Sequence, residues 1–298
     1  MMTFMLSMSS LAHAQSLEIK ANSIHELDLT HLNEQGVHEV HFGKLILNDK
    51  SVLLIPSIPS DQVVKIIVDE LEVHGKAYIA QAFDKKLEYL FQSNANPFDH
   101  FNLLSTAQNV ARGRDGSSSS EEVGANAGHG ENGADGIAGK STIKKLILDI
   151  HIKKIDKLVI ALISQNGGNG GDGGNGGRGG PADAAAHGGN GGNGGNGGKG
   201  GLPGNTGSVE LYWQSDYPMI LTGELPVNIQ ILQAPGLVGR PGRGGNGGLG
   251  GDAWHGLWRM RGGDNGANGA IGESAKPNNE YFFFGSVGNV KVINKDNQ

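Results

Sequence analysis

One short segment of the chain gathers the side chains best suited to binding. Two of the three tryptophans lie in it, together with a histidine, two arginines, a leucine and a methionine. Tryptophan and arginine dominate binding hot spots, because they offer large contact area with few rotamers to restrict. We therefore predict a binding surface made by Trp254, His255, Leu257, Trp258, Arg259, Met260 and Arg261. The alternative is that these side chains fold back as an apolar plug on the glycine-rich segments beside them.

The other groupings of reactive side chains favour structural roles. His38 and His41 fall in an expected strand and point to opposite faces, so we interpret them as a surface pair rather than a metal site. The lysines between residues 144 and 157 alternate with Ile and Leu, which indicates a solvated sheet face. Without cysteine no thiol nucleophile exists. We expect no catalytic residues, metal or cofactor, and predict that the protein is not an enzyme.

Glycine-rich tracts flank the tryptophan segment and form the strongest pattern in the sequence. Glycine makes up 51 of 298 residues, against roughly 7% in ordinary proteins. Residues 166–201 contain two runs of Gly-Gly-X triplets around a break at 181–186, with X being Asn166, Asn169, Asp172, Asn175 and Arg178, then His187, Asn190, Asn193, Asn196 and Lys199. A period of three is typical of the polyproline II helix. The two runs therefore predict a hairpin of two such helices.

Two further tracts repeat this arrangement. The three predicted hairpins span residues 109–140, 166–207 and 236–272, and their turns fall at 117–123, 181–187 and 252–260. The first is less regular, with Gly130, Gly133, Gly136 and Gly139 in one arm. Because glycine has no side chain, such rods can approach closely enough for their backbone groups to bond to each other. We expect one bundle, with all three turns at its far end.

Short apolar runs between and before these tracts predict β-strands. The expected strands are 17–20, 38–47, 52–55, 63–73, 76–82, 87–91, 101–106, 143–152, 157–164, 208–214, 227–233 and 287–293. We predict an all-β fold, with a β-rich N-terminal domain at 15–108 and strands interleaved with the hairpins at 109–298. The base is either a β-sandwich or a β-solenoid, and the hairpins form a polyglycine II bundle on it.

Three other interpretations of the glycine tracts remain open. A flexible linker has the same composition but needs neither equal arms nor strict phase. A collagen triple helix would require more proline and fewer breaks. Calcium-binding nonapeptide repeats require a recurrent aspartate, and the second tract holds only Asp172.

The extreme N-terminus predicts export. Residues 1–14 form a short apolar stretch ending in Ala12-His13-Ala14, the small-x-small pattern of a signal peptidase site. No other apolar stretch approaches the roughly 20 residues that span a bilayer, so we expect no membrane span. The net charge is −6 and no basic patch has the size of a domain, which argues against a nucleic-acid partner. We predict a secreted, periplasmic or cell-surface protein.

The triplet-phased arms Asn166-Gly-Gly-Asn-Gly-Gly-Asp-Gly-Gly and Asn190-Gly-Gly-Asn-Gly-Gly-Asn-Gly-Gly resemble the polyglycine II bundle in the tip domain of T-even-like phage tail-fibre adhesins. They are also similar to glycine-rich antifreeze proteins of springtails and to bacterial collagen-like secreted proteins. The resemblance covers residues 113–272. In the phage family the tip loops bind a host surface receptor, which implies such a role for residues 117–123, 181–187 and 252–260 here.

Together these patterns predict an adhesin or a surface or matrix binding module, whose bundle is a stiff spacer that presents its loops to a cell-surface protein or polysaccharide. One alternative is a structural component of an envelope or matrix that associates with itself. Another is an ice-binding protein, which the Asn, Asp, Arg and Lys at the X positions disfavour. The sequence leaves the oligomeric state open.

Overall fold

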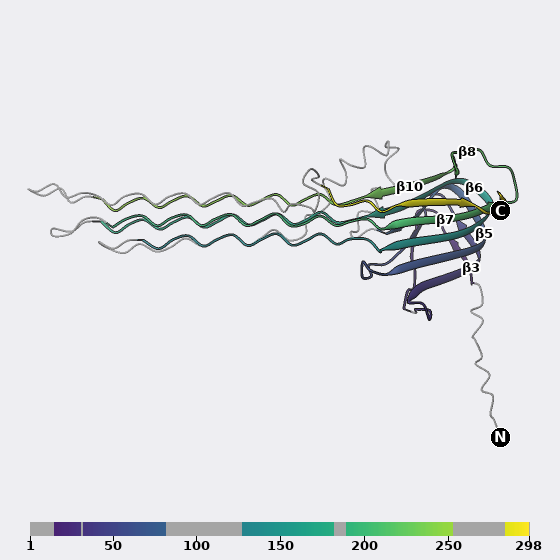
Figure 1. Ribbon diagram of the computed structural model, residues 1–298, viewed down its shortest axis with the longest axis horizontal. Helices are drawn as coiled ribbons and strands as arrows, with labels where there is room; N and C mark the ends of the chain where they lie inside the picture. The colour runs from purple at the N-terminus through teal and green to yellow at the C-terminus, as the bar shows by residue number, and fades with distance from the viewer. Residues whose placement is uncertain (1–14, 31, 82–126, 182–188, 253–283, 298) are drawn as a thin grey trace, which may run out of the picture.

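The structure is a computed structural model that describes residues 15–30, 32–81, 127–181, 189–252 and 284–297 (Figure 1). This part of the chain is all-β, as predicted. Its strands are β1 (Gln15–Ile19), β2 (Ile24–Glu26), β3 (Val37–Leu47), β4 (Val52–Leu54), β5 (Val63–Gln81), β6 (Lys145–Ile163), β7 (Ser208–Ser215), β8 (Leu221–Thr222), β9 (Leu225–Pro226), β10 (Ile229–Ala234) and β11 (Val290–Asn294), followed by the 3-10 helix η1 (Lys295–Asn297). No helix in the described ranges is long and apolar enough to cross a membrane.

Nine of these strands form one sheet in which every pairing is parallel. Its main path runs β1-β3-β5-β6-β7-β11, while β2, β4 and β10 extend a second part of it. β8 and β9 form a separate antiparallel pair. Each turn of the chain therefore lies parallel on the previous one. This is the pairing of a solenoid rather than of an antiparallel sandwich.

The long strands β5 and β6 each belong to two layers. β5 pairs first with β3 and then with β4, and its register shifts between Val68 and Leu71 and again between Val73 and Lys76. Gly75 lies at this corner with φ of 75°, a conformation that glycine adopts without strain. β6 divides in the same way, pairing first with β7 and then with β10. The chain thus folds back on itself once per turn.

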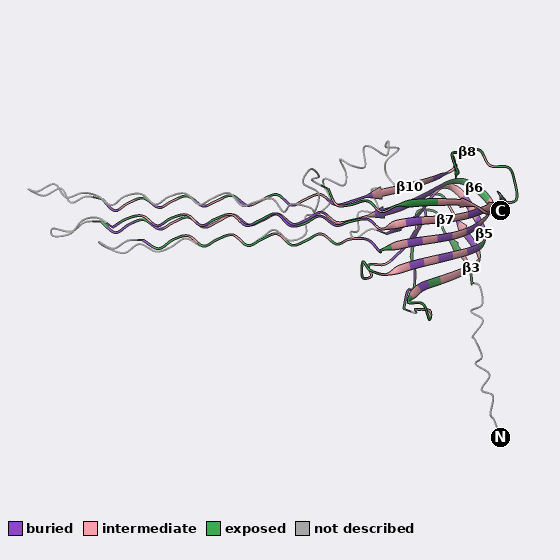
Figure 2. Ribbon diagram, in the orientation of Figure 1, coloured by how far each residue is buried: buried purple, intermediate pink, exposed green. Residues whose placement is uncertain are grey.

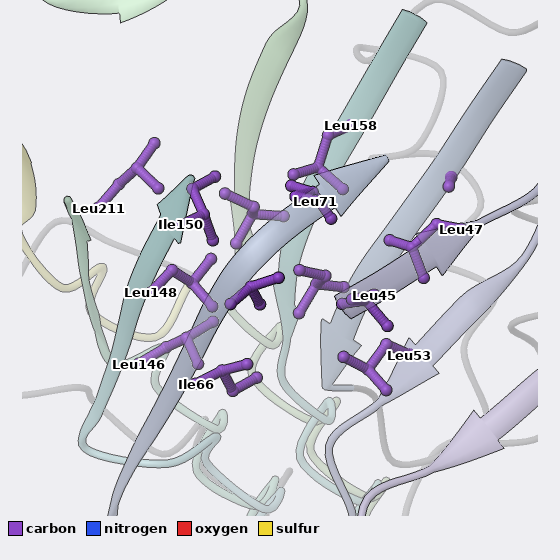
Figure 3. Packing of buried hydrophobic residues seen from close by; sticks show 14 of the residues in the cluster. Leu45, Leu47, Leu53, Ile66, Leu71, Leu146, Leu148, Ile150, Leu158 and Leu211 are labelled. Atoms are coloured by element: carbon purple, nitrogen blue, oxygen red, sulfur yellow. The ribbon is translucent and has the colours of Figure 1, made fainter. Parts of the chain in front are cut away.

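Apolar side chains fill the space between the two layers. In the first part of β6, Leu146, Leu148 and Ile150 alternate with more exposed residues and join one large buried cluster (Figure 3). The second layer is apolar on both faces, since Tyr78 and Ala161 belong to another buried cluster on the far side from this core. A strand with one buried face alternates between apolar and polar residues, and a strand with two buried faces is apolar throughout. β6 contains both patterns because its first part lies in the first layer and its second part lies in the second layer.

Most expected strands are present, with corrections at the corners. The strands predicted at 63–73 and 76–82 are one strand, β5, and those at 143–152 and 157–164 are one strand, β6. Apolar runs interrupted by a glycine or a lysine pair read as two strands, although the backbone only bends there. β5 and β6 pair directly, so strands from both predicted segments, 15–108 and 109–298, lie in one sheet. The strands predicted at 87–91 and 101–106 lie outside the described residues.

Candidate functional site: the glycine-rich arms

Five extended segments without strand assignment adjoin strand ends on one side of the sheet. We name them arm A (127–142), arm B (164–181), arm C (189–207), arm D (235–252) and arm E (284–289). Arms A, C and E lead into β6, β7 and β11, while arms B and D continue from β6 and β10. Figure 1 shows them running side by side, away from the sheet. The turns of the solenoid on this side are thus extended into long arms.

Backbone hydrogen bonds connect the arms with a period of three residues. Arms B and C form an antiparallel hairpin, in which Gly192, Gly195 and Gly198 donate to carbonyls of arm B at 2.8 to 2.9 Å. Arm B donates in turn to arm A, and arm D donates to arm C, also antiparallel. Arms A and C are parallel, as are arms B and D. Arm C therefore bonds to arms A, B and D along its length, and Thr206 near its base also donates to Ser286 of arm E.

The glycines are needed because the arms nearly touch. A Cβ atom on Gly198 would lie 1.9 Å from the carbonyl oxygen of Ala134 in arm A, and one on Gly197 would lie 2.1 Å from that of Gly242 in arm D. Real Cβ atoms do not approach an oxygen so closely. Two of three positions in the triplets of arm C thus face another arm.

Arm A differs from the other arms because it lies at the edge of the described bundle. Gly130, Gly133, Gly136 and Gly139 lie against the backbone of a neighbouring arm, and the residues between them are exposed (Figure 2). Those exposed positions hold Glu, Asn, Ala, Asp and Ile. An arm therefore needs one glycine per triplet for each side on which another arm lies against its backbone. Arm A has fewer such sides than arm C, which explains its irregular sequence.

Asparagine and aspartate side chains add a second hydrogen bond per triplet between the parallel arms. In arm B, Asn169 Oδ1 accepts from the N–H of Arg240 at 2.9 Å, and Asp172 Oδ1 accepts from the N–H of Arg243 at 2.8 Å. Arm A supports arm C in the same way. In the described residues these acceptors are His129, Asn132, Asp135, Ser141 and Thr142 toward arm C, and Asn166, Asn169, Asp172 and Asn175 toward arm D. These X residues hold the arms together.

The arms continue the register of the sheet. The N–H of Ser164, at the end of β6, donates to Ala234 of β10, and three residues further Gly167 donates to Leu237. At the other layer Thr142 donates to Asn205, and three residues further Lys145 of β6 is paired with Ser208 of β7. Sheet and arms are therefore one hydrogen-bonded body with a common register.

Two buried side chains make hydrogen bonds where the arms meet the base. Gln81, at the end of β5, donates to the carbonyl of Pro56 at 3.0 Å and accepts from the N–H of Ile143 at 2.8 Å. Ser164 Oγ donates to the carbonyl of Asn205 at 2.6 Å, which links arm B to arm C. Because these polar groups are buried, losing a partner would cost more than the bond itself contributes.

Ion pairs cover the outer face of the first layer. Lys65 pairs with Glu39 at 3.0 Å. Lys145, which belongs to the predicted basic stretch, pairs with Glu210 at 2.9 Å and therefore lies on a solvated sheet face. His41 Nε2 lies 2.9 Å from Asp69, but His38 is buried, so the prediction of a surface pair is correct for His41 alone. The described residues contain no group of three metal-ligating side chains.

The predicted binding segment lies outside the described residues. This applies to Trp254, His255, Leu257, Trp258, Arg259, Met260 and Arg261, and to the loops at 117–123 and 182–187. The structure does describe Asp252, which precedes this segment and pairs with Arg178 of arm B through Nη2 and Oδ2. Sequence reasoning missed the acceptor role of the X residues, although the recurrence of Asn and Asp in one arm was a signal for it.

Comparisons with known proteins give no match. A scan against protein-family models found no matching family, and neither the curated proteins nor the solved structures that were searched contain a match.

Proposed function

We propose that the arms are polyglycine II helices and that they form a stiff bundle. Three features support this assignment: the three-residue period of the hydrogen bonds, the mixture of parallel and antiparallel neighbours, and the contact of glycine backbone with glycine backbone. Lone polyproline II helices have no internal hydrogen bonds, so such rods stay ordered only beside several others. Arm C, which bonds to arms A, B and D along its length, meets that condition.

We propose further that the protein is an exported, non-enzymatic adhesin or surface and matrix binding module. The bundle would act as a spacer, and the turns beyond arms B and D would contact a cell-surface protein or polysaccharide. The observation that carries the proposal is the register shared by sheet and arms, because it makes the spacer a continuation of the base. With the rise of about 3.1 Å per residue of this helix type, arm B would reach roughly 50 Å from the sheet. Export rests on the sequence of residues 1–14.

A rigid spacer suits adhesion for an energetic reason. A contact surface at the end of a flexible chain loses conformational freedom when it binds, and this loss reduces affinity. A surface held by cross-bonded arms has lost that freedom on folding. The ion pair between Arg178 and Asp252 connects two arms near the positions where the described arms end.

Self-association into a matrix is the second candidate, and arm A argues against one route to it. Another bundle could add to an open edge only where glycine backbone faces outward. The outer positions of arm A include Glu131 and Ile137, whose side chains oppose such close approach. Side chains of this kind also blunt the edges of β-sheets. The ice-binding alternative would need a flat face of small residues, whereas arm D presents Arg240 and Arg243.

The proposal is tested by removing the two tryptophans of the third turn. The double variant Trp254→Ala, Trp258→Ala should lose binding to cells and to immobilised polysaccharides, while circular dichroism and melting temperature stay unchanged. Leu249→Ala, at an exposed apolar position of arm D, is the matched control and should bind normally. If the double variant binds like the unmodified protein, the turn is not the contact surface. Concentration-dependent assembly that persists in the double variant would favour the matrix role instead.

A further inference from the structure

The end of the base opposite the arms presents an apolar hairpin. β8 and β9 pair there around Gly223, and the N–H of Val227 donates to the carbonyl of Ile220 at 3.0 Å. Figure 1 shows β8 on the far side of the sheet from the arms. The side chains of Ile220 and Val227 are 75% and 51% exposed, and Tyr217 and Leu221 beside them are exposed too. An apolar group of this kind, repeated on one hairpin, is typical of an interaction site.

The hairpin is held firmly in place by its other face. Met219 and Leu225 pack against the core between the layers. Trp213, buried in β7, donates its indole N–H to the carbonyl of Glu224 at 3.2 Å. At the base of the hairpin, Asn228 Nδ2 donates to the carbonyl of Asp156 at 2.8 Å. The exposed side chains are therefore on a rigid support, and binding would require no ordering of the hairpin.

Exposed lysines lie on the turns that stack beside this hairpin. Hydrogen bonds join successive corners of the solenoid, from Asn22 to Asp49, from Lys50 to Lys76, and from Gly75 to Asp156. These corners carry four exposed lysines, none of which makes an ion pair with a described carboxylate: Lys20, Lys50, Lys154 and Lys157. Lys154 instead contacts the ring of His74 at 3.1 Å.

Most carboxylates at the same end already have partners. Asp49 accepts from the N–H of Lys76 and Asp156 accepts from that of Gly75. Asp216 accepts hydrogen bonds from Lys153 and from His151, and these bonds, that of Lys153 more strongly, lower the pKa of its carboxyl group. Two further acidic side chains lie at this end: Glu224, on the exposed turn of the hairpin, and Asp296, which accepts from the N–H of Ser215 at 3.1 Å. Lys20, Lys50, Lys154 and Lys157 thus make no ion pair with a described carboxylate, whereas Asp216 is already paired with Lys153.

We propose that this end of the base binds an anionic lipid surface, with the β8–β9 hairpin inserted at the headgroup level. Apolar side chains that penetrate the interface and lysines that contact acidic headgroups act together in peripheral membrane binding. A tyrosine such as Tyr217 suits the boundary between headgroups and acyl chains. The arms then point away from the membrane. This inference is independent of the proposed role of the tryptophan turn, because the β8–β9 hairpin and that turn share no residue.

The test is flotation of the purified full chain with vesicles of phosphatidylcholine, alone or mixed with phosphatidylglycerol. We expect binding to the mixed vesicles that weakens as salt is raised. The variant Ile220→Ser, Val227→Ser should reduce partitioning by about tenfold for each side chain, since each loses the burial of a large apolar group. The control Ile137→Ser, Leu249→Ser removes apolar side chains of similar exposure from the arms and should bind normally.

A charge variant separates the two parts of the surface. Lys154→Gln, Lys157→Gln should weaken binding to the mixed vesicles by about fivefold for each lysine. Lys140→Gln, Lys199→Gln changes the net charge equally but on the arms, and should have no effect. Equal binding to neutral vesicles, or no binding to either kind, would overturn the proposal. So would sedimentation showing a dimer that the hairpin variant abolishes, because the hairpin would then contact a second copy of the chain.

Discussion

Replacing Gly198 by alanine should break the bundle at its centre. The residue lies in arm C, where its N–H donates to Gly171 of arm B and its carbonyl accepts from Gly242 of arm D, both at 2.8 Å. Its third side faces arm A, and the new Cβ would lie 1.9 Å from the oxygen and 2.5 Å from the carbon of the Ala134 carbonyl. Backbone cannot rotate away as a side chain can, so arms A and C must separate by about an ångström or more.

Separation of these arms breaks several hydrogen bonds at once. Around Gly198, arms A and C are joined by the N–H groups of Gly133 and Gly136 to backbone carbonyls and by the N–H of Lys199 to the Asp135 carboxylate. A shift of arm C also disturbs its bonds to arms B and D, which involve the N–H groups of Gly198 and Gly242. At about 1 kcal/mol net for each bond, losing three to five of them costs about 3 to 5 kcal/mol. Alanine also restricts the unfolded chain, which offsets about 0.4 to 1 kcal/mol. We expect a net loss of about 2 to 4 kcal/mol.

The adjacent substitution Lys199→Ala is the matched control. Lys199 is exposed, and its side chain can be removed without bringing any atom closer to another arm. Because arms can open while the base stays folded, amide hydrogen exchange should accompany denaturant unfolding. In Gly198→Ala the arm amides should exchange faster, whereas those of β5 and β6 should keep their protection. Equal exchange and equal stability in the two variants would refute the close packing of the arms.

Three further predictions concern single side chains. Asn169→Ala should cost about 1 kcal/mol and speed exchange at the Arg240 amide, since it removes that amide's acceptor; Asn169→Asp should restore protection, and no change in either would contradict the role of the X residues. Gln81→Leu should destabilise the protein to urea by about 2 to 4 kcal/mol, because it leaves the N–H of Ile143 and a carbonyl unpaired; a loss below that of the exposed control Lys199→Ala would argue against this junction. Burial raises the pKa of Tyr78 to about 12 from 10.0, so the folded state favours the neutral phenol. The stability that this group contributes is complete below pH 10 and is lost as pH rises toward 12, by about 3 kcal/mol. Tyr78→Phe should flatten this part of the plot of stability against pH, and an unchanged plot would show that another group titrates.

Patterns within one segment were readable from the sequence. The alternation in β6 predicted a half-buried strand, and the equal Gly-Gly-X runs predicted that arms B and C return on each other, which their antiparallel hydrogen bonds confirm. The corners of β5 and β6 were not readable, because a bend that keeps both halves buried leaves the apolar pattern nearly continuous. The predicted turn with Trp254 and Trp258 stays a prediction.

The identity of neighbours came only with the tertiary structure. Parallel pairing joins residues far apart in the sequence, such as Thr142 with Asn205 and Ser164 with Ala234, and no local pattern specifies such partners. The three-residue spacing of the glycines by itself determined that the arms could pack backbone against backbone. The solenoid decided which face of each arm meets which neighbour. This arrangement explains why Asn169 is an acceptor while Lys199 is exposed. The physical reason is that the stacking of the solenoid's turns sets the register in which the arms leave the sheet.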